Sequence, residues 1–164
     1  AGEIPSNHWT QDQSQGGGRL VGEACHFVDL LNFITDSSVA NYSISSFGKS
    51  LKEGALKDNF SIGLEYENGS FGTIHYFSKG GSSFPKERLE IFTDNSTLQL
   101  DNYRSLKAYN WPGFSGKKYF RLDKGHTHCV EEFINSINYG LAAPIAFSDI
   151  IHSSKKTIEI ANSL

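Results

Sequence analysis

Apolar residues recur at helical spacing near both ends of the chain and alternate with polar residues in the middle. Steps of three and four residues predict a helix over residues 20–35, with a stripe made of Ala24, Phe27, Leu31 and Ile34. The same spacing predicts a helix over residues 127–139, ended by Gly140, whose stripe is Val130, Phe133, Ile134 and Ile137. A third helix is expected to start at a Ser148 cap and run to residue 162, with Ile151, Ile158 and Ala161 facing inward.

Alternating apolar and polar residues predict strands in the middle of the chain. Two such runs flank Asn68-Gly69, which is a strong signal for a hairpin turn. A two-residue turn would set Tyr66 opposite Phe71, which makes one face of the hairpin apolar and turns His75 toward the core. Strands are expected at residues 41–48, 60–66, 71–77, 88–93, 97–100 and 105–110.

The order of one helix, a block of strands and two helices predicts an α+β fold, with an open, mostly antiparallel β-sheet and helices packed on one face. The other face would carry Ile74, Tyr76 and Phe92, and because such a face needs a cover we expect a homo-oligomer through it. The 164 residues suit a single domain over residues 1–164. This length and the absence of Met suggest that the chain is part of a longer protein.

Composition argues against several classes of function. A net charge of −3 with scattered basic residues is unlike a nucleic-acid binder. No run approaches the roughly 20 apolar residues of a membrane span. Cys25 and Cys129 are far apart and form neither a zinc motif nor a disulfide framework, which favours free thiols in a reducing cytoplasm. No glycine-rich dinucleotide fingerprint follows a strand, so the chain shows no means of binding NAD by itself.

Glu23, His26 and Asp29 follow one another at three-residue steps, so they share one side of the predicted helix. An imidazole exchanges protons near neutral pH, and a carboxylate one turn away can orient the ring and favour its charged form. This spacing makes Glu23 and His26 candidate catalytic residues, with a purely structural carboxylate–histidine pair as the alternative.

Other clusters carry weaker candidate chemistry. His8 and Trp9 offer an aromatic platform for the apolar side of a sugar ring, unless the tryptophan plugs the edge of the domain. The glycines at residues 16–18 either form a flexible link or let the backbone approach a ligand closely. A metal site at His126, His128 and Cys129 would need further ligands, which the sequence does not supply nearby.

The segment that holds these candidates resembles the start of the C-terminal domain in the glucose–fructose oxidoreductase and inositol dehydrogenase family. That domain often opens with a glycine run, a carboxylate, and a helix that reads His-x-x-Asp-Leu-Leu, as residues 16–18, Glu23 and residues 26–31 do here. The bi-domain oxidoreductase subgroup is the most similar, through residues 1–5, His8-Trp9 and residues 22–27.

The resemblance implies a dihydrodipicolinate-reductase-like fold and a separate N-terminal Rossmann domain, absent from this chain, that binds NAD or NADP. In that scheme His26 takes a proton from a substrate hydroxyl as a hydride leaves, and a lysine of the Rossmann domain assists. Substrate contacts are expected from Arg19, which can grip a carboxylate or phosphate, and from Trp9, His8 and Asp29. Many members carry an Asp four residues before the His. That position is Gly22 here, so either Glu23 takes its role or the role is lost.

Two functions are therefore expected. The first is the substrate-binding domain of an NAD(P)-dependent oxidoreductase that acts on a sugar, a sugar nucleotide or a polyol. Such a domain is inactive by itself and binds no cofactor without its Rossmann partner. The second is a non-catalytic binding or assembly module that keeps the fold, which Gly22 in place of the usual Asp would favour. A small ligand-binding domain unrelated to dehydrogenases is the remaining alternative.

Overall fold

The computed structural model describes residues 4–5, 7–12, 14–47, 58–81 and 83–164. The chain divides into two compact units, residues 1–80 together with residues 145–164, and residues 81–144. Both lie within the predicted domain of residues 1–164. Residue 48 of the expected strand 41–48, and residues 1–3 of the segment quoted for the resemblance, lie outside the described residues.

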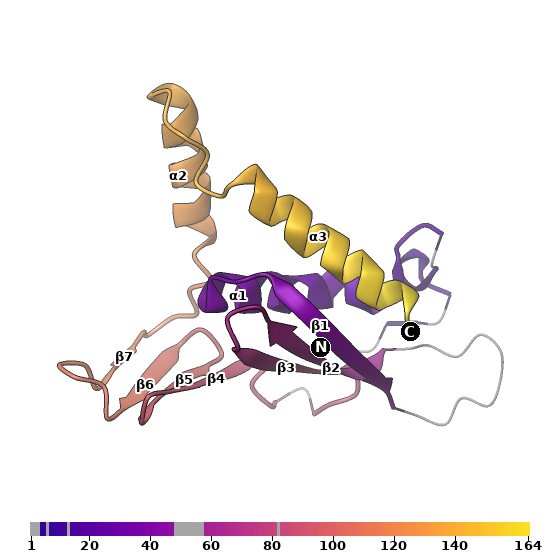
Figure 1. Cartoon of the computed structure of the whole chain (residues 1–164), viewed down its shortest axis with the longest axis horizontal. Coiled ribbons are helices and arrows are strands. Elements are labelled where there is room, and N and C mark those ends of the chain that lie inside the picture. The colour runs from indigo at the N-terminus through magenta and orange to yellow at the C-terminus, as the bar shows by residue number, and fades with distance from the viewer. Residues whose placement is uncertain (1–3, 6, 13, 48–57, 82) are drawn as a thin grey trace. The chain divides into compact units, whose positions relative to one another are not determined.

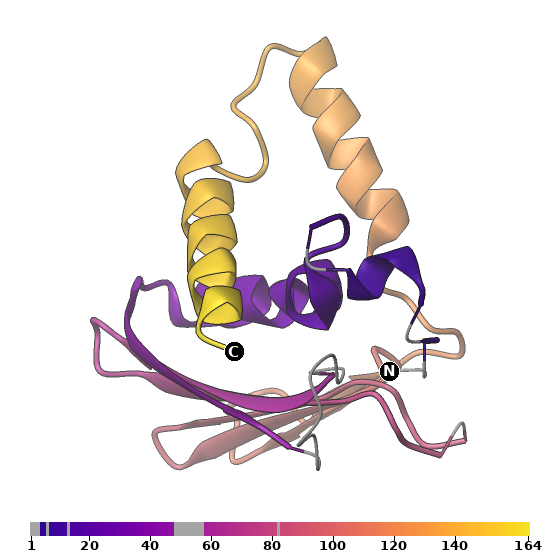
Figure 2. The same cartoon turned by 90° about the vertical axis from the view of Figure 1, so that its right-hand side faces the viewer.

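The first unit is an antiparallel sheet in the order β1, β2, β3, with α1 and α3 on one face (Figures 1 and 2). A π-helical turn, η2, precedes α1, so the helix predicted over residues 20–35 is a π turn followed by an α-helix. The elements are η1 (Trp9–Gln11, a 3-10 turn), η2 (Leu20–Ala24), α1 (Cys25–Thr35), β1 (Val39–Ser46), β2 (Asn59–Tyr66), β3 (Phe71–Phe77) and α3 (Phe147–Asn162).

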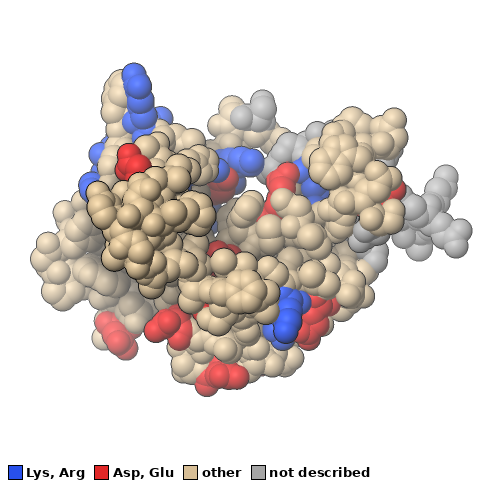
Figure 3. Space-filling model, turned by 90° about the horizontal axis from the view of Figure 1, so that it is seen from above, with Lys and Arg blue, Asp and Glu red and all other residues tan. Residues whose placement is uncertain are grey.

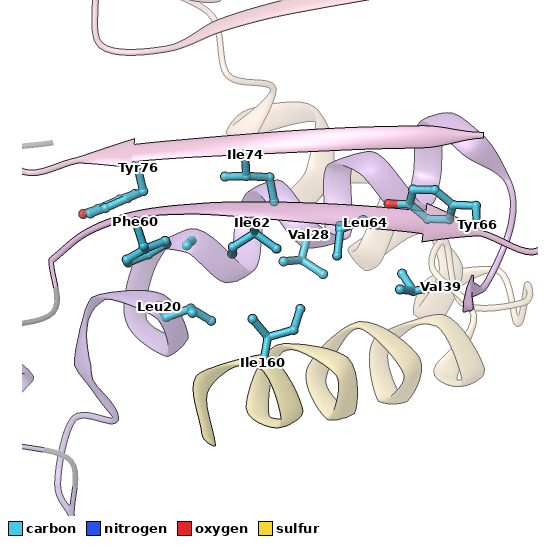
Figure 4. Packing of buried hydrophobic residues seen from close by; sticks show 11 residues of the cluster. Leu20, Val28, Val39, Phe60, Ile62, Leu64, Tyr66, Ile74, Tyr76 and Ile160 are labelled. Carbon is cyan, nitrogen blue, oxygen red and sulfur yellow. The ribbon is translucent and has the colours of Figure 1, made fainter. Parts of the chain in front are cut away.

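The core of this unit lies between the sheet and the helices (Figure 4). Alternate residues of β2 point into it, as the sequence pattern predicts, and each is at most 4% exposed. They contribute the largest part of the apolar burial, at roughly 1.5–3 kcal/mol for each large side chain. The main core residues are Phe60, Ile62, Leu64 and Tyr66 of β2, Ile74 and Tyr76 of β3, Val28 of α1 and Ile160 of α3.

The β2–β3 hairpin corrects the predicted register. Its loop has three residues: the Tyr66 amide donates to the Ser70 carbonyl (3.0 Å), and Gly69 within the loop has a φ of 84°. The extra residue sets Glu65 opposite Phe71. Because a shift of one residue exchanges the two faces of a strand, every side chain of β3 lies on the face opposite to the predicted one.

Both predictions about the faces of β3 are therefore wrong. Ile74 and Tyr76 are buried in the core and do not belong to the outer face. His75 lies outside the core, where its Nδ1 is 2.6 Å from the Ser61 hydroxyl oxygen. The exposed aromatic residues of the outer face are Phe71 and Phe77.

The apolar pattern of helix α3 predicts only part of the face that packs against the core. Ser148 is wrong as a cap, because the helix begins at Phe147 with Ala146 at the cap position, and no side chain in the described part of the chain caps it. Ile158 is also wrong as an inward residue: it is 50% exposed, whereas Ile160 is fully buried. Two residues turn an α-helix by about 200°, so these two isoleucines lie on opposite sides. Ala161 packs against the core as predicted.

The second unit has a four-stranded antiparallel sheet, so the strands form two sheets where one was expected. Asp94 and Asn95 both have positive φ in the tight loop between its first two strands, as a two-residue hairpin turn requires. The helix of this unit, predicted over residues 127–139, is ended by Gly140 as expected, where φ is 63°. The elements are β4 (Arg88–Thr93), β5 (Ser96–Asp101), β6 (Ser105–Tyr109), β7 (Gly116–Lys118), which was not predicted, and α2 (His126–Asn138).

These units confirm the α+β class with open antiparallel sheets. Among the described residues, no helix has both the length and the apolar character needed to span a bilayer. On the face shown in Figure 3, acidic and basic side chains are scattered among uncharged ones.

Candidate functional site

The glycine run before the candidate catalytic residues forms a tight turn packed against η1. The Asp12 carbonyl accepts hydrogen bonds from the amides of Gln15, Gly16 and Gly17, at 2.8–3.2 Å. A Cβ atom at Gly16 would lie 2.5 Å from Cα of Thr10, so no larger residue fits there without a shift of the backbone. Gly16 therefore permits close contact of backbone with backbone at this turn.

Glu23 lies in the π-helical turn between two groups that hold its carboxylate. Arg19 Nη1 forms an ion pair with Glu23 Oε1, and the Tyr76 hydroxyl donates to Glu23 Oε2 at 2.7 Å. Arg19 and Tyr76 are both 4% exposed. Burial, and then the hydrogen bond and charge of Glu23, raise the pKa of Tyr76, so the phenol stays neutral and remains a donor.

His26 is the second residue of α1 and its side chain is exposed. Among the described residues, the imidazole makes no hydrogen bond. Asp29, one turn further on, accepts a hydrogen bond from Ser153 of α3 (2.7 Å). In the predicted group of Glu23, His26 and Asp29, both carboxylates are therefore hydrogen-bonded to side chains outside the group. The imidazole of His26, which lies between them in the sequence, is exposed.

Ser153 continues a chain of hydrogen bonds that joins α3, α1 and the sheet. The Asn32 amide donates to Ser153 Oγ at 3.0 Å, and the Tyr66 hydroxyl donates to Asn32 Oδ1 at 3.2 Å. Because Asp29 lies at the end of this chain, its carboxylate helps to dock α1 against α3.

His8 and Trp9 line an open hollow of about 470 Å³, together with Asn7, Gln11, Asp12 and Gln15. Trp9 is 60% exposed, and its ring lies 5.8 Å from that of His8. The Asp12 carboxylate accepts hydrogen bonds from Ser14 and Gln15, which lower its pKa. The Gln11 side-chain nitrogen is buried beside this hollow, without a hydrogen-bond partner among the described residues. An exposed indole next to amide groups is a surface suited to a hydroxylated ligand.

Sequence reasoning missed Tyr76 as a site residue, because the wrong register put it on the outer face. The only available signal was its chemistry: a buried tyrosine needs a partner for its hydroxyl, and the partner proves to be Glu23. For the alternative metal site at His126, His128 and Cys129, no group of three or more His, Cys, Asp or Glu residues in the described parts of the chain could hold an ion.

A model of the GFO/IDH/MocA C-terminal domain matches residues 2–99. No curated protein matches the sequence. Among solved structures, an oxidoreductase domain protein from Kribbella flavida is 16% identical with a TM-score of 0.72, over 99% of this chain and 55% of its own. An aldose-aldose oxidoreductase from Caulobacter crescentus is 12% identical with a TM-score of 0.70, over 99% and 50% of the two chains.

A third similar structure is a UDP-N-acetylglucosamine 3-dehydrogenase from Acidithiobacillus ferrooxidans, 15% identical with a TM-score of 0.63, over 85% of this chain and 43% of that one. At such low identity these structures show a shared fold. The chain spans about half the length of each of them. The family model covers more than half of the chain, so this chain belongs to the GFO/IDH/MocA C-terminal domain family.

Proposed function

We propose that this chain is the substrate-binding domain of a nicotinamide-dependent oxidoreductase that acts on a sugar, a sugar nucleotide or a polyol. Family membership supports the oxidoreductase, and the names of two similar structures, an aldose-aldose oxidoreductase and a UDP-N-acetylglucosamine 3-dehydrogenase, support the substrate class. The solved structures are about twice as long as this chain, which supports a companion domain.

The observation that carries the proposal is the position of His26. It is an exposed imidazole at the start of α1, next to a π-helical turn whose carboxylate is held from two sides. In the proposed reaction a substrate C–H bond gives up a hydride, the hydroxyl oxygen on that carbon becomes a carbonyl, and its proton moves to the His26 imidazole. His26 is thus the general base in oxidation and the general acid in reduction.

The nicotinamide, which would accept the hydride, is assigned to the companion domain as NAD or NADP. The described residues of this chain do not fit that cofactor, because the glycine turn at residues 16–18 is packed against η1 and follows no strand. The chain by itself is therefore inactive in this proposal.

The remaining site residues divide into two groups. Trp9 and His8 contact the substrate, through stacking of the indole on the apolar side of a sugar ring and hydrogen bonds from the hollow beside it. Arg19 and Asp29 are bonded within the chain, and we assign them the support of the surface around His26 in place of a direct grip on the substrate.

The outer face of the first sheet is proposed to join copies of the protein. Phe71 and Phe77 are 65% and 53% exposed there. Apolar patches exposed on a protein surface often mark interfaces between proteins, and an interface on this face would cover both rings. The two cysteines of the chain are free thiols, which is compatible with the reducing cytoplasm expected from the sequence.

The test uses the complete protein that carries this chain. NADH and NADPH are titrated against it by fluorescence quenching, and NAD⁺ or NADP⁺ reduction is then followed with a panel of aldoses, UDP-sugars and polyols. We expect saturable binding of at least one nicotinamide and turnover with a member of the panel. Absence of nicotinamide binding would contradict the proposal and favour the non-catalytic assembly module.

A further inference from the structure

Two buried tyrosines connect the sheet of the first unit to its helical layer, one at each end of α1. The Tyr66 hydroxyl on β2 donates to Asn32 near the C-terminus of α1. The Tyr76 hydroxyl on β3 donates to Glu23, just before the N-terminus of α1. Both rings belong to the same core (Figure 4). The two hydroxyls therefore make comparable links, but only Tyr76 bonds to a residue close to His26 in the sequence, because Glu23 lies three positions before it.

The position of Tyr76 is fixed by its surroundings. Its ring stacks on Phe60, with centroids 5.0 Å apart and planes 10° from parallel. A ring held in this way delivers its hydroxyl to one place, so the hydrogen bond to Glu23 leaves the carboxylate little freedom. Arg19 holds the other carboxylate oxygen.

This arrangement fixes the turn from which α1 starts. Arg19 precedes η2 and Glu23 is its fourth residue, so the ion pair spans nearly the whole π-helical turn. Ala24, the last residue of η2, is fully buried, and His26 follows two residues later. π-helical turns are less regular than α-helix and are frequent at functional sites. A π turn that is held at both ends therefore sets where α1 begins and where the His26 side chain emerges.

We infer that Tyr76 is a positioning residue for proton transfer by His26, acting through Glu23 and the π-helical turn. This inference rests on the proposed function and adds a residue to it. It also gives Glu23 a role other than a direct pair with His26, because both carboxylate oxygens are bonded to residues that hold the turn.

Turnover of the complete protein distinguishes a role of Tyr76 in positioning His26 from a role in the stability of the fold alone. Tyr76→Phe removes only the hydroxyl and keeps the stacked ring, and Tyr66→Phe is the matched control at the far end of α1. For Tyr76→Phe we expect kcat to fall on the order of 10-fold to 100-fold with little change in KM, because a displacement of about 1 Å at a reacting group costs about that much. For Tyr66→Phe we expect kcat within about 2-fold of the wild type.

A second measurement needs no substrate. Cys25 begins α1 directly after the π turn, and burial, with the charges of Asp29 and Glu23, raises the pKa of its thiol. Iodoacetamide labelling of Cys25, followed by peptide mass spectrometry, should be faster in Tyr76→Phe and unchanged in Tyr66→Phe. Glu23→Gln, which breaks the ion pair with Arg19, should reproduce the labelling and kcat defects of Tyr76→Phe. It replaces Tyr76→Phe in the test if Tyr76→Phe folds poorly.

The outcomes distinguish the inference from the proposed function. If His26→Gln leaves turnover unchanged, the proposed function fails. If His26→Gln abolishes turnover but Tyr76→Phe and Tyr66→Phe give the same kcat and the same Cys25 labelling rate, the inference is overturned and the proposed function stands.

Discussion

Two isoleucines of α3 offer a direct test of how this fold is held together. Ile160 is fully buried against the sheet and α1, whereas Ile158 is 50% exposed on the other side of the same helix. Replacing each by Ala removes the same atoms at neighbouring positions. The gain in helix propensity is also the same, a few tenths of a kcal/mol, and cancels in the comparison.

The expected loss in the free energy of unfolding follows from how deeply each isoleucine is buried. Ile160→Ala removes three buried carbon groups, worth about 0.8 kcal/mol each, and leaves a cavity that adds to the loss. We expect a total of about 3 kcal/mol, within the range of roughly 2–5 kcal/mol for such changes. Ile158→Ala removes atoms that already contact water, so its cost should stay below about 1 kcal/mol.

The assay should report on the first unit alone, because two units need not unfold together. Hydrogen exchange of the β2 amides, which form the centre of this sheet, meets that need. The predicted result is a loss of protection about 2–3 kcal/mol larger for Ile160→Ala than for Ile158→Ala. For the unit as a whole, the Tm should fall by roughly 4–8 °C for each kcal/mol lost. Equal effects of the two variants would refute the packing of α3 described here.

Two further predictions concern the same unit. Burial raises the pKa of Tyr66 from 10 to about 12, so the folded state keeps a proton that the unfolded state loses. The contribution of neutral Tyr66 to the free energy of unfolding is fully present below pH 10. It is lost as the pH rises to about 12, at up to about 1.4 kcal/mol per pH unit. Urea midpoints measured across this range should fall less steeply in Tyr66→Phe, and an unchanged slope would contradict the assignment. Gly16→Ala should destabilise the turn by about 1–3 kcal/mol, because its Cβ would lie 2.5 Å from Cα of Thr10, whereas Gly22→Ala, with no atom within 4 Å, should be neutral or slightly stabilising in thermal unfolding.

The sequence predicts the fold of the first unit well where the pattern is dense. The alternation in β2 identifies its buried face correctly, because a strand between helices and water has only two choices of face. The register of β3 escapes this reasoning. Asn68-Gly69 is compatible with loops of two or three residues, and a difference of one residue reverses a whole strand.

At the candidate site, too, the sequence predicts local spacing but not tertiary contacts. The helix spacing of Glu23 and His26 is visible in the sequence, but the partners of Glu23 are set by tertiary structure. Tyr76 reaches it from a strand 53 positions away in the chain. In α3, Ile158 is more apolar than the buried residues Ser153 and Thr157 of the same helix. Ser153 is held by its hydrogen bonds with Asp29 and Asn32, and Thr157 is 2% exposed, and a count of apolar residues detects neither.

The central claim, that His26 transfers the proton in an oxidoreductase reaction, is tested most directly by comparing two histidine variants of the complete protein. His26→Gln removes the exposed imidazole at the start of α1, and His75→Gln removes one on the outer face of the sheet. The measurement is kcat/KM for nicotinamide reduction with the substrate found in the panel. We expect a loss on the order of 10²-fold to 10⁴-fold for His26→Gln and little change for His75→Gln. Undiminished kcat/KM in His26→Gln, with the fold and nicotinamide binding intact, would contradict the claim.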